Sequence, residues 1–126
     1  MPRISNLIHS YEKPFLLHSC GNIFPVMDDI INVAKIDAKH SNEDVIAPFS
    51  KWLQLYSGRI ALFGGADMSY ICTSSEAEIK EYVLEILGYA SQYPGFAFGT
   101  GNSVPDYIPV ETYLAMVETA RKFRGE

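Results

Sequence analysis

The chain has 126 residues, 48% of them hydrophobic, and a formal net charge of −5. This length suits one domain, residues 1–126, with a substantial core, and the composition argues against disorder. Basic residues do not cluster, no apolar run nears the ~20 residues of a membrane helix, and the N-terminus lacks a signal-peptide core. We therefore expect a cytoplasmic protein with no nucleic-acid or membrane partner.

The first predicted elements are a helix over residues 4–11 and a short buried strand that begins at Phe15 and is broken by Gly21. Alternate side chains of a strand share a face, so His18 and Cys20 should project the same way from its carboxyl end. Parallel α/β sheets carry their chemistry at that end, and an imidazole with a thiolate suits zinc. The alternative is a buried thiol beside a hydrogen-bonded histidine.

Three further strand–helix units follow in the sequence. Apolar periodicity predicts a helix over 23–34, a strand over 36–40, a helix over 45–56, a strand over 60–63, a helix opened by the capping box Ser75–Glu78 and reaching Ala90, a strand over 96–98 and a last helix over 110–120. Gly64 and Gly65 are expected to end the third strand, and the residues up to the capping box are expected to form a loop. Cys72 in this loop is interpreted as a plain half-buried thiol.

The alternation of strands and helices predicts an α/β fold with parallel strands and right-handed crossovers. Two architectures fit: an open three-layer sheet, or half of a (β/α)8 barrel. A complete barrel needs roughly 200 residues or more, so this chain cannot close one by itself. The chain also opens in a helix without a preceding strand, and we interpret it as a truncated piece with about four βα units.

The loop after the second strand offers Glu43 as an oxygen ligand for a metal. The alternative is a first-turn carboxylate favoured by the helix dipole. His40 is a rival ligand, but period two places it opposite Asp37 and Lys39. A charged pair should avoid the covering helices, so we expect Asp37 and Lys39 to face the polar side of the sheet and His40 to look away from it.

Polar loops also follow the third and fourth strands. Asp67, after the two glycines, could orient a ligand, or could cap a tight turn. The loop 99–103 carries Asn102 and Ser103 and is expected to face a polar ligand. It lacks the lysine of a Walker motif and the third glycine of a dinucleotide fingerprint, so a nucleotide is not expected there.

The runs 17–22, 60–67 and 101–111 together resemble the C-terminal part of the uroporphyrinogen decarboxylase superfamily. This superfamily includes the decarboxylase of haem synthesis and zinc-dependent methyltransferases of the methylcobalamin:coenzyme M type. The resemblance covers essentially the whole chain but only about the last third of a family member. It implies the carboxyl-terminal half of a (β/α)8 barrel, with these strands as barrel strands five to eight.

The resemblance also implies a site. His18 and Cys20 match the first two zinc ligands of the methyltransferase branch, and Glu43 matches an acidic ligand of that site. The third family ligand is a cysteine in the last loop, where this chain has Asn102. Asp67, Asn102 and Ser103 are the predicted substrate-binding residues. The decarboxylase branch carries a histidine in the last loop, which is absent here, and its pyrrole-binding groups lie in the N-terminal half.

The sequence is therefore consistent with three candidate functions. The first is methyl transfer from methylcobalamin or another corrinoid, held by a corrinoid protein, to a small thiol activated by zinc. The second is tetrapyrrole binding and decarboxylation in porphyrin biosynthesis, a lyase activity. The third is a non-catalytic half-barrel or assembly partner. Four barrel strands would leave two open edges and a bare inner face, so we expect a homodimer or pairing with an N-terminal half.

Overall fold

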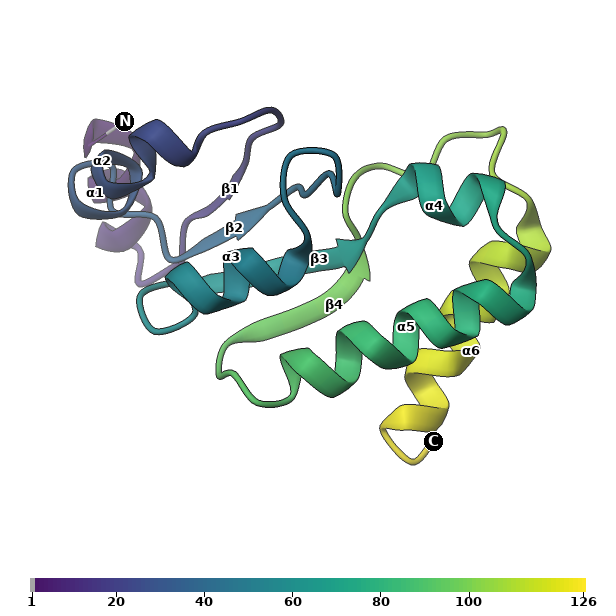
Figure 1. The fold of residues 1–126 in the computed structure, drawn as a ribbon. Coiled ribbons are helices and arrows are strands. Elements are labelled where there is room, and N and C mark those ends of the chain that lie inside the picture. The colour runs from purple at the N-terminus through teal and green to yellow at the C-terminus, as the bar shows by residue number, and fades with distance from the viewer. Residues whose placement is uncertain (1) are drawn as a thin grey trace.

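The computed structural model describes residues 2–126 and contains one parallel four-stranded sheet (Figure 1). The strands are β1 (Leu16–His18), β2 (Ala38–His40), β3 (Ala61–Ala66) and β4 (Phe96–Thr100). They lie side by side in sequence order, and each neighbouring pair is parallel. This confirms the predicted fold class, a partial (β/α)8 barrel of four βα units.

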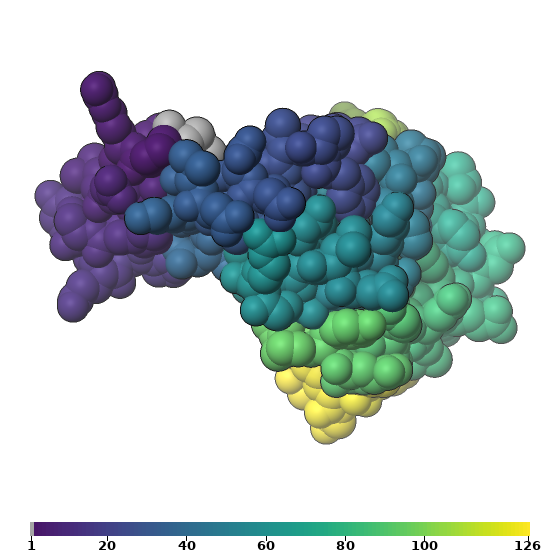
Figure 2. All heavy atoms as spheres, turned by 60° about the vertical axis from the view of Figure 1, so that its left-hand side comes forward, coloured from purple at the N-terminus to yellow at the C-terminus, as the bar shows by residue number. Residues whose placement is uncertain are grey.

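The remaining elements are helical, and those that follow β1 pack over one face of the sheet (Figure 1). They are α1 (Pro2–Ser10), the 3₁₀ turn η1 (Phe24–Val26), α2 (Met27–Asn32), α3 (Phe49–Tyr56), α4 (Met68–Thr73), α5 (Glu76–Ala90) and α6 (Val110–Phe123). In the space-filling view the N-terminal residues, in purple, lie at one end of the molecule, and the end of α6, in yellow, lies at the lower edge (Figure 2).

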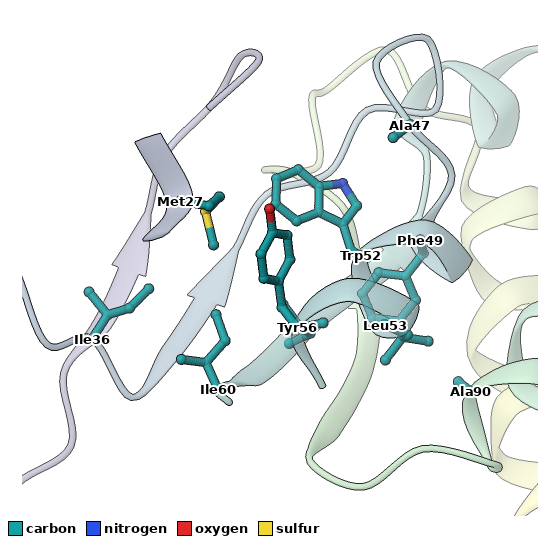
Figure 3. Close-up of a cluster of buried hydrophobic side chains, with 10 residues drawn as sticks. Met27, Ile36, Ala47, Phe49, Trp52, Leu53, Tyr56, Ile60 and Ala90 are labelled. Atoms are coloured by element: carbon teal, nitrogen blue, oxygen red, sulfur yellow. The ribbon is translucent and has the colours of Figure 1, made fainter. Parts of the chain in front are cut away.

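The core consists of two apolar clusters on the helix side of the sheet. In the first, aromatic and aliphatic side chains of α3 point towards the first three strands and towards Met27 of α2 (Figure 3). Its buried members are Met27, Ile36, Ala47, Phe49, Trp52, Leu53, Tyr56, Ile60, Leu62 and Ala90. The second cluster lies under α4, α5 and α6, with Ile71, Ile79, Val83 and Met116 among its buried members. Both follow the apolar spacing of the sequence, including the helix that opens at the capping box.

Two segments differ from the expectation, both near the third strand. β3 continues through Gly64 and Gly65 to Ala66, because these glycines adopt φ values of 126° and 119° and keep their pairing with β4. The segment expected to be a loop then forms the short helix α4. Asp67 caps that helix, its carboxylate accepting a hydrogen bond from the backbone N–H of Tyr70 at 3.1 Å.

The helices around Pro25 and Pro48 are shorter than the spacing predicted. The helix expected over 23–34 is divided into the 3₁₀ turn η1 and α2. The helix expected over 45–56 begins only at Phe49, because Pro48 occupies the N-cap in an extended conformation and Val45 is exposed rather than packed.

The face of the sheet opposite the helices is open over the described residues. Leu16 is 46% exposed and Phe63 is 36% exposed. Register places Leu16 beside Ala38 and Ala61, and places His18 beside His40 and Phe63, so these side chains share that face. The open face therefore combines apolar surface with both histidines.

The first cluster gives a direct test of the core. Leu53 is fully buried in α3, whereas Leu55 on the same helix is 49% exposed. We expect Leu53→Ala to lower the free energy of unfolding by about 2–5 kcal/mol, because it removes packed methyl groups and leaves a cavity. Leu55→Ala should change it by less than about 0.5 kcal/mol. Urea denaturation of both variants measures the difference, and equal losses would contradict this assignment of the core.

Candidate functional site

The candidate site is built around two histidines at the carboxyl ends of β1 and β2. His18 and His40 are direct register partners, with their Nδ1 atoms 2.8 Å apart and their ring centroids 4.9 Å apart. The other ring nitrogen of His40, Nε2, lies 2.9 Å from the carbonyl oxygen of Thr100 at the end of β4. The sheet is thus curved enough for its second and fourth strands to meet at the mouth.

His40 was expected to look away from this mouth, and that expectation is wrong. The reason is the placement of Lys39, which lies on the helix side of β2 and is only 3% exposed. Its Nζ sits 4.2 Å from the centroid of the Trp52 ring and donates a hydrogen bond to the carbonyl oxygen of Ser41. With Lys39 under the helices, period two turns His40 to the same side as His18.

Cys20 completes the group, and the expected proximity of His18 and Cys20 is confirmed. The Sγ atom lies 3.4 Å from Nε2 of His18. The hydroxyl of Ser41 donates to Sγ at 3.5 Å and the side-chain amide of Asn102 donates at 3.4 Å. These two hydrogen bonds, that of Ser41 first, hold the pKa of the Cys20 thiol below its usual value, because they stabilise the thiolate. The loop residue Asn102 therefore belongs to the site.

The donor atoms of His18 and Cys20 fit zinc in their chemical type and in the distance between them. Zinc bonds of about 2.0–2.1 Å to nitrogen and 2.3 Å to sulfur, in tetrahedral geometry, place the two ligand atoms about 3.5 Å apart. Nε2 of His18 and Sγ of Cys20 are 3.4 Å apart. Within residues 2–126, however, no three His, Cys, Asp or Glu side chains gather so that they could hold a metal ion. The described chain thus offers two positions of a zinc site.

The remaining predicted residues differ in their surroundings. Glu43 is near enough for its carboxylate to oppose the lowering of the Cys20 pKa, and its role as a zinc ligand stays a prediction. Both oxygens of the buried Asp67 carboxylate accept backbone hydrogen bonds, from Asp44 at 2.8 Å and from Tyr70 at 3.1 Å. These contacts match the capping alternative. A substrate contact of Asp67, or of the exposed Ser103, also stays a prediction.

Asn42 joins the loop after β2 to the carboxyl ends of β3 and β4, and sequence reasoning missed it. Its side chain exchanges two hydrogen bonds with the backbone of Gly65, and its backbone N–H donates to the carbonyl of Gly101 at 2.9 Å. A Cβ atom on Gly101 would lie 2.5 Å from the Asn42 carbonyl oxygen, and one on Gly64 would lie 2.6 Å from its side-chain oxygen. Glycines at the carboxyl ends of two neighbouring strands were the available signal of this close approach.

A second buried polar group lies beside these loops. The hydroxyl of Tyr82, from α5, donates to the Asp44 carboxylate at 2.8 Å and accepts from the backbone N–H of Asp67 at 2.9 Å. Burial raises the pKa of Asp44 and, more strongly, that of Tyr82. This group links the loop after β2 to α5 and supports the mouth from the helix side.

The family of the chain is shown by comparison with known proteins. The sequence model of uroporphyrinogen decarboxylase (URO-D) matches residues 1–123. The chain belongs to the uroporphyrinogen decarboxylase family. A solved structure of a methyltransferase from Methanosarcina mazei shares the fold, with a TM-score of 0.72 and 22% sequence identity. No curated protein sequence matches the chain.

The alignment with that structure covers 97% of this chain and 35% of the methyltransferase, so the chain spans about a third of the length of that solved structure. The four-stranded sheet is therefore similar in fold to one part of that larger structure. Over residues 2–126, no helix has both the length and the apolar character needed to cross a membrane.

Lys39 gives the site a measurable pH dependence. Burial lowers its pKa from 10.5 to about 8, so the unfolded chain binds this proton more tightly than the folded chain. The free energy of unfolding should therefore rise, through this group, as the pH increases from about 8 towards 10.5, by a few kcal/mol at about 1.4 kcal/mol per pKa unit.

The matched variant is Lys39→Met, which keeps the apolar stem. It should be more stable than the wild type at pH 7, and this advantage should shrink as the pH approaches 10. Urea denaturation of both proteins at several pH values gives the difference. A stability difference that stays constant over this pH range would show that Lys39 keeps its ordinary pKa in the folded chain.

Proposed function

We propose that the chain is the C-terminal part of a methyl-transfer enzyme of this family, in which a methyl group passes from a methylated corrinoid to a small thiol. The observation that carries the proposal is the pair of donor atoms, His18 Nε2 and Cys20 Sγ, 3.4 Å apart at the carboxyl end of β1. The active sites of (β/α)8 barrels lie at this end of the strands. The fold shared with a methyltransferase structure supports the same reading.

His18 and Cys20 are the residues that would hold the zinc ion of such an enzyme, with Glu43 as the predicted acidic ligand. When bound, zinc supplies Lewis acidity that lowers the pKa of a thiol substrate. The chain's own polar groups prepare the site for this use. A cysteine must lose its proton to bind a metal, and the hydrogen bonds from Ser41 and Asn102 favour that thiolate.

The barrel must be completed by other strands, because the chain spans about a third of the similar methyltransferase. Over the described residues β1 and β4 are the two edges of the sheet, and Leu16 and Phe63 are exposed on the open face. Open edges and bare apolar surface favour association. We propose that an N-terminal half or a second copy of the chain covers this face, and that the corrinoid protein approaches at the mouth.

Tetrapyrrole binding and decarboxylation is the second candidate, because the matching family model is that of uroporphyrinogen decarboxylase. In that branch the protein positions the tetrapyrrole and stabilises charge during loss of CO₂, without a metal. Titration of the chain with a porphyrin and with a corrinoid separates the two candidates. A chain that binds neither ligand and no metal would instead match the non-catalytic half-barrel.

Cobalt(II), which substitutes for zinc and absorbs light when bound by a thiolate, tests the donor pair. We expect the metal-free chain to bind cobalt(II) with a sulfur charge-transfer band, because Cys20 supplies a thiolate beside an imidazole. His18→Ala and Cys20→Ser should each lose this band. Cys72→Ser is the matched control and should keep it, since Cys72 lies in α4 away from the pair. A band that survives Cys20→Ser would contradict the proposal.

The resemblance implies that Asn102 stands in place of the third ligand cysteine of the methyltransferase branch, and its amide lies 3.4 Å from Cys20 Sγ. We expect Asn102→Cys to raise the zinc affinity, because a thiolate is a far better zinc ligand than a neutral amide. Asn102→Ala, which removes the amide without adding sulfur, is the control and should not raise it. Zinc competition with a chromophoric chelator measures both. No gain for the cysteine variant would mean that this loop does not correspond to the ligand loop of the family.

A further inference from the structure

We propose that His40 is a positioning residue that fixes the tautomer of His18. It does so through a chain of hydrogen bonds that begins at the Thr100 carbonyl and ends with the lone pair of His18 Nε2 facing Cys20 Sγ. The consequence for metal binding rests on the proposed function, whereas the tautomer is a property of the metal-free chain and can be measured without any metal.

The direction of these hydrogen bonds follows from the donor and acceptor capacity of each atom. The Thr100 carbonyl oxygen can only accept a hydrogen bond, so Nε2 of His40, 2.9 Å away, must carry the hydrogen. A neutral imidazole carries one hydrogen, and Nδ1 of His40 is therefore an acceptor. His18 Nδ1, 2.8 Å from it, must then be the donor. This leaves the lone pair of His18 on Nε2, the atom 3.4 Å from Cys20 Sγ, where it accepts the S–H hydrogen while Cys20 is a thiol and is free for a metal once Cys20 is deprotonated.

This tautomer decides what His18 can do. An imidazole nitrogen can bind a metal, or accept the S–H hydrogen of a thiol, only where its lone pair is free. The partner of the other ring nitrogen selects that tautomer, and in most metal sites the partner is a carboxylate, a carbonyl or water. Here His18 has another imidazole as its partner. The Thr100 carbonyl, which His18 does not contact, fixes the tautomer of His40, and His40 in turn fixes the tautomer of His18.

The fold holds each of the hydrogen-bonded groups in place. Parallel register puts the two histidines side by side, and the burial of Lys39 beneath Trp52 keeps His40 on the mouth face. The Thr100 peptide is held next to them, because Gly101 N–H donates to the Ala66 carbonyl at 2.6 Å and the Gly101 carbonyl accepts from Asn42. His40 has both of its ring nitrogens engaged, so its orientation is determined by two contacts.

The test is long-range ¹H–¹⁵N correlation NMR on the metal-free chain labelled at histidine nitrogen, with a chelator, at pH 8. The chain has three histidines, and His9 serves as the internal reference because its Nε2 bonds Asp37 at 2.7 Å, far from the site. We expect His18 to carry its hydrogen on Nδ1 and His40 to carry it on Nε2. A wild-type spectrum with the His18 hydrogen on Nε2 would overturn the proposal without the need for any variant.

The variant arm uses His40→Phe, which keeps a ring of similar shape but has no nitrogen, and His40→Gln, which keeps a polar side chain. We expect both to release His18 from the Nδ1–H tautomer, whereas His9→Phe, the matched control, should leave the His18 signals unchanged. Circular dichroism checks that each variant is folded. A folded variant at position 40 whose His18 keeps the wild-type tautomer would show that His40 does not set it.

Metal affinity supplies the second measurement. Substituting the partner of a metal-bound histidine costs about 10–100-fold in affinity, so His40→Phe should weaken cobalt(II) binding by that factor. Equal affinity in the wild type and the variant would overturn the positioning role towards a metal. If the wild type binds no cobalt(II), the proposed function fails, while the NMR result still decides whether His40 sets the His18 tautomer.

Discussion

The burial of Lys39 beneath Trp52 determines which side chains reach the mouth of the sheet. Successive residues of a strand face opposite sides, so the side taken by Lys39 fixes the side taken by His40. The loss of hydration of the Lys39 ammonium group is compensated by the Trp52 ring, whose centroid lies 4.2 Å away, and by the Ser41 carbonyl. Its pKa of about 8 shows that this compensation is incomplete, because desolvation still disfavours the charge. The histidine pair thus depends on a lysine that lies on the other face of the sheet.

Asn42 provides the second constraint, because it holds the loop after β2 against the carboxyl ends of β3 and β4. Its contacts with Gly65 and Gly101 bring the end of β4 across β3, so that the Thr100 carbonyl reaches His40 on β2. Only glycine allows the backbone to approach this closely at positions 64 and 101. Curvature, which a barrel requires of all its strands, is here supported by one buried residue, through its side-chain amide on β3 and its backbone N–H at the end of β4.

The sequence was sufficient for the features that depend on local pattern. The alternation of side chains along one strand predicted that His18 and Cys20 lie together at its carboxyl end. Apolar spacing predicted four parallel strands and the capped helix α5. It was not sufficient where a tertiary contact reverses the usual preference. A lysine is expected to avoid a helix-covered face, and the contacts of Lys39 with the Trp52 ring and the Ser41 carbonyl explain its place there. The short helix α4 likewise depends on the cap by Asp67, whose carboxylate could as well have served a ligand.

Under the proposed function, Asn102 stands where the methyltransferase branch has a ligand cysteine, and its amide alters the site without closing it. An amide N–H that donates to Sγ stabilises the thiolate and engages one of its lone pairs, but a thiolate sulfur keeps others for a metal. The positions not supplied by His18 and Cys20 would then have to come from Glu43, from the substrate thiol or from the rest of the barrel. A catalytic zinc ion needs an open position for its substrate. Under the proposed function, the small number of ligands in this chain would therefore lower the affinity for zinc without removing the chemistry that zinc supplies.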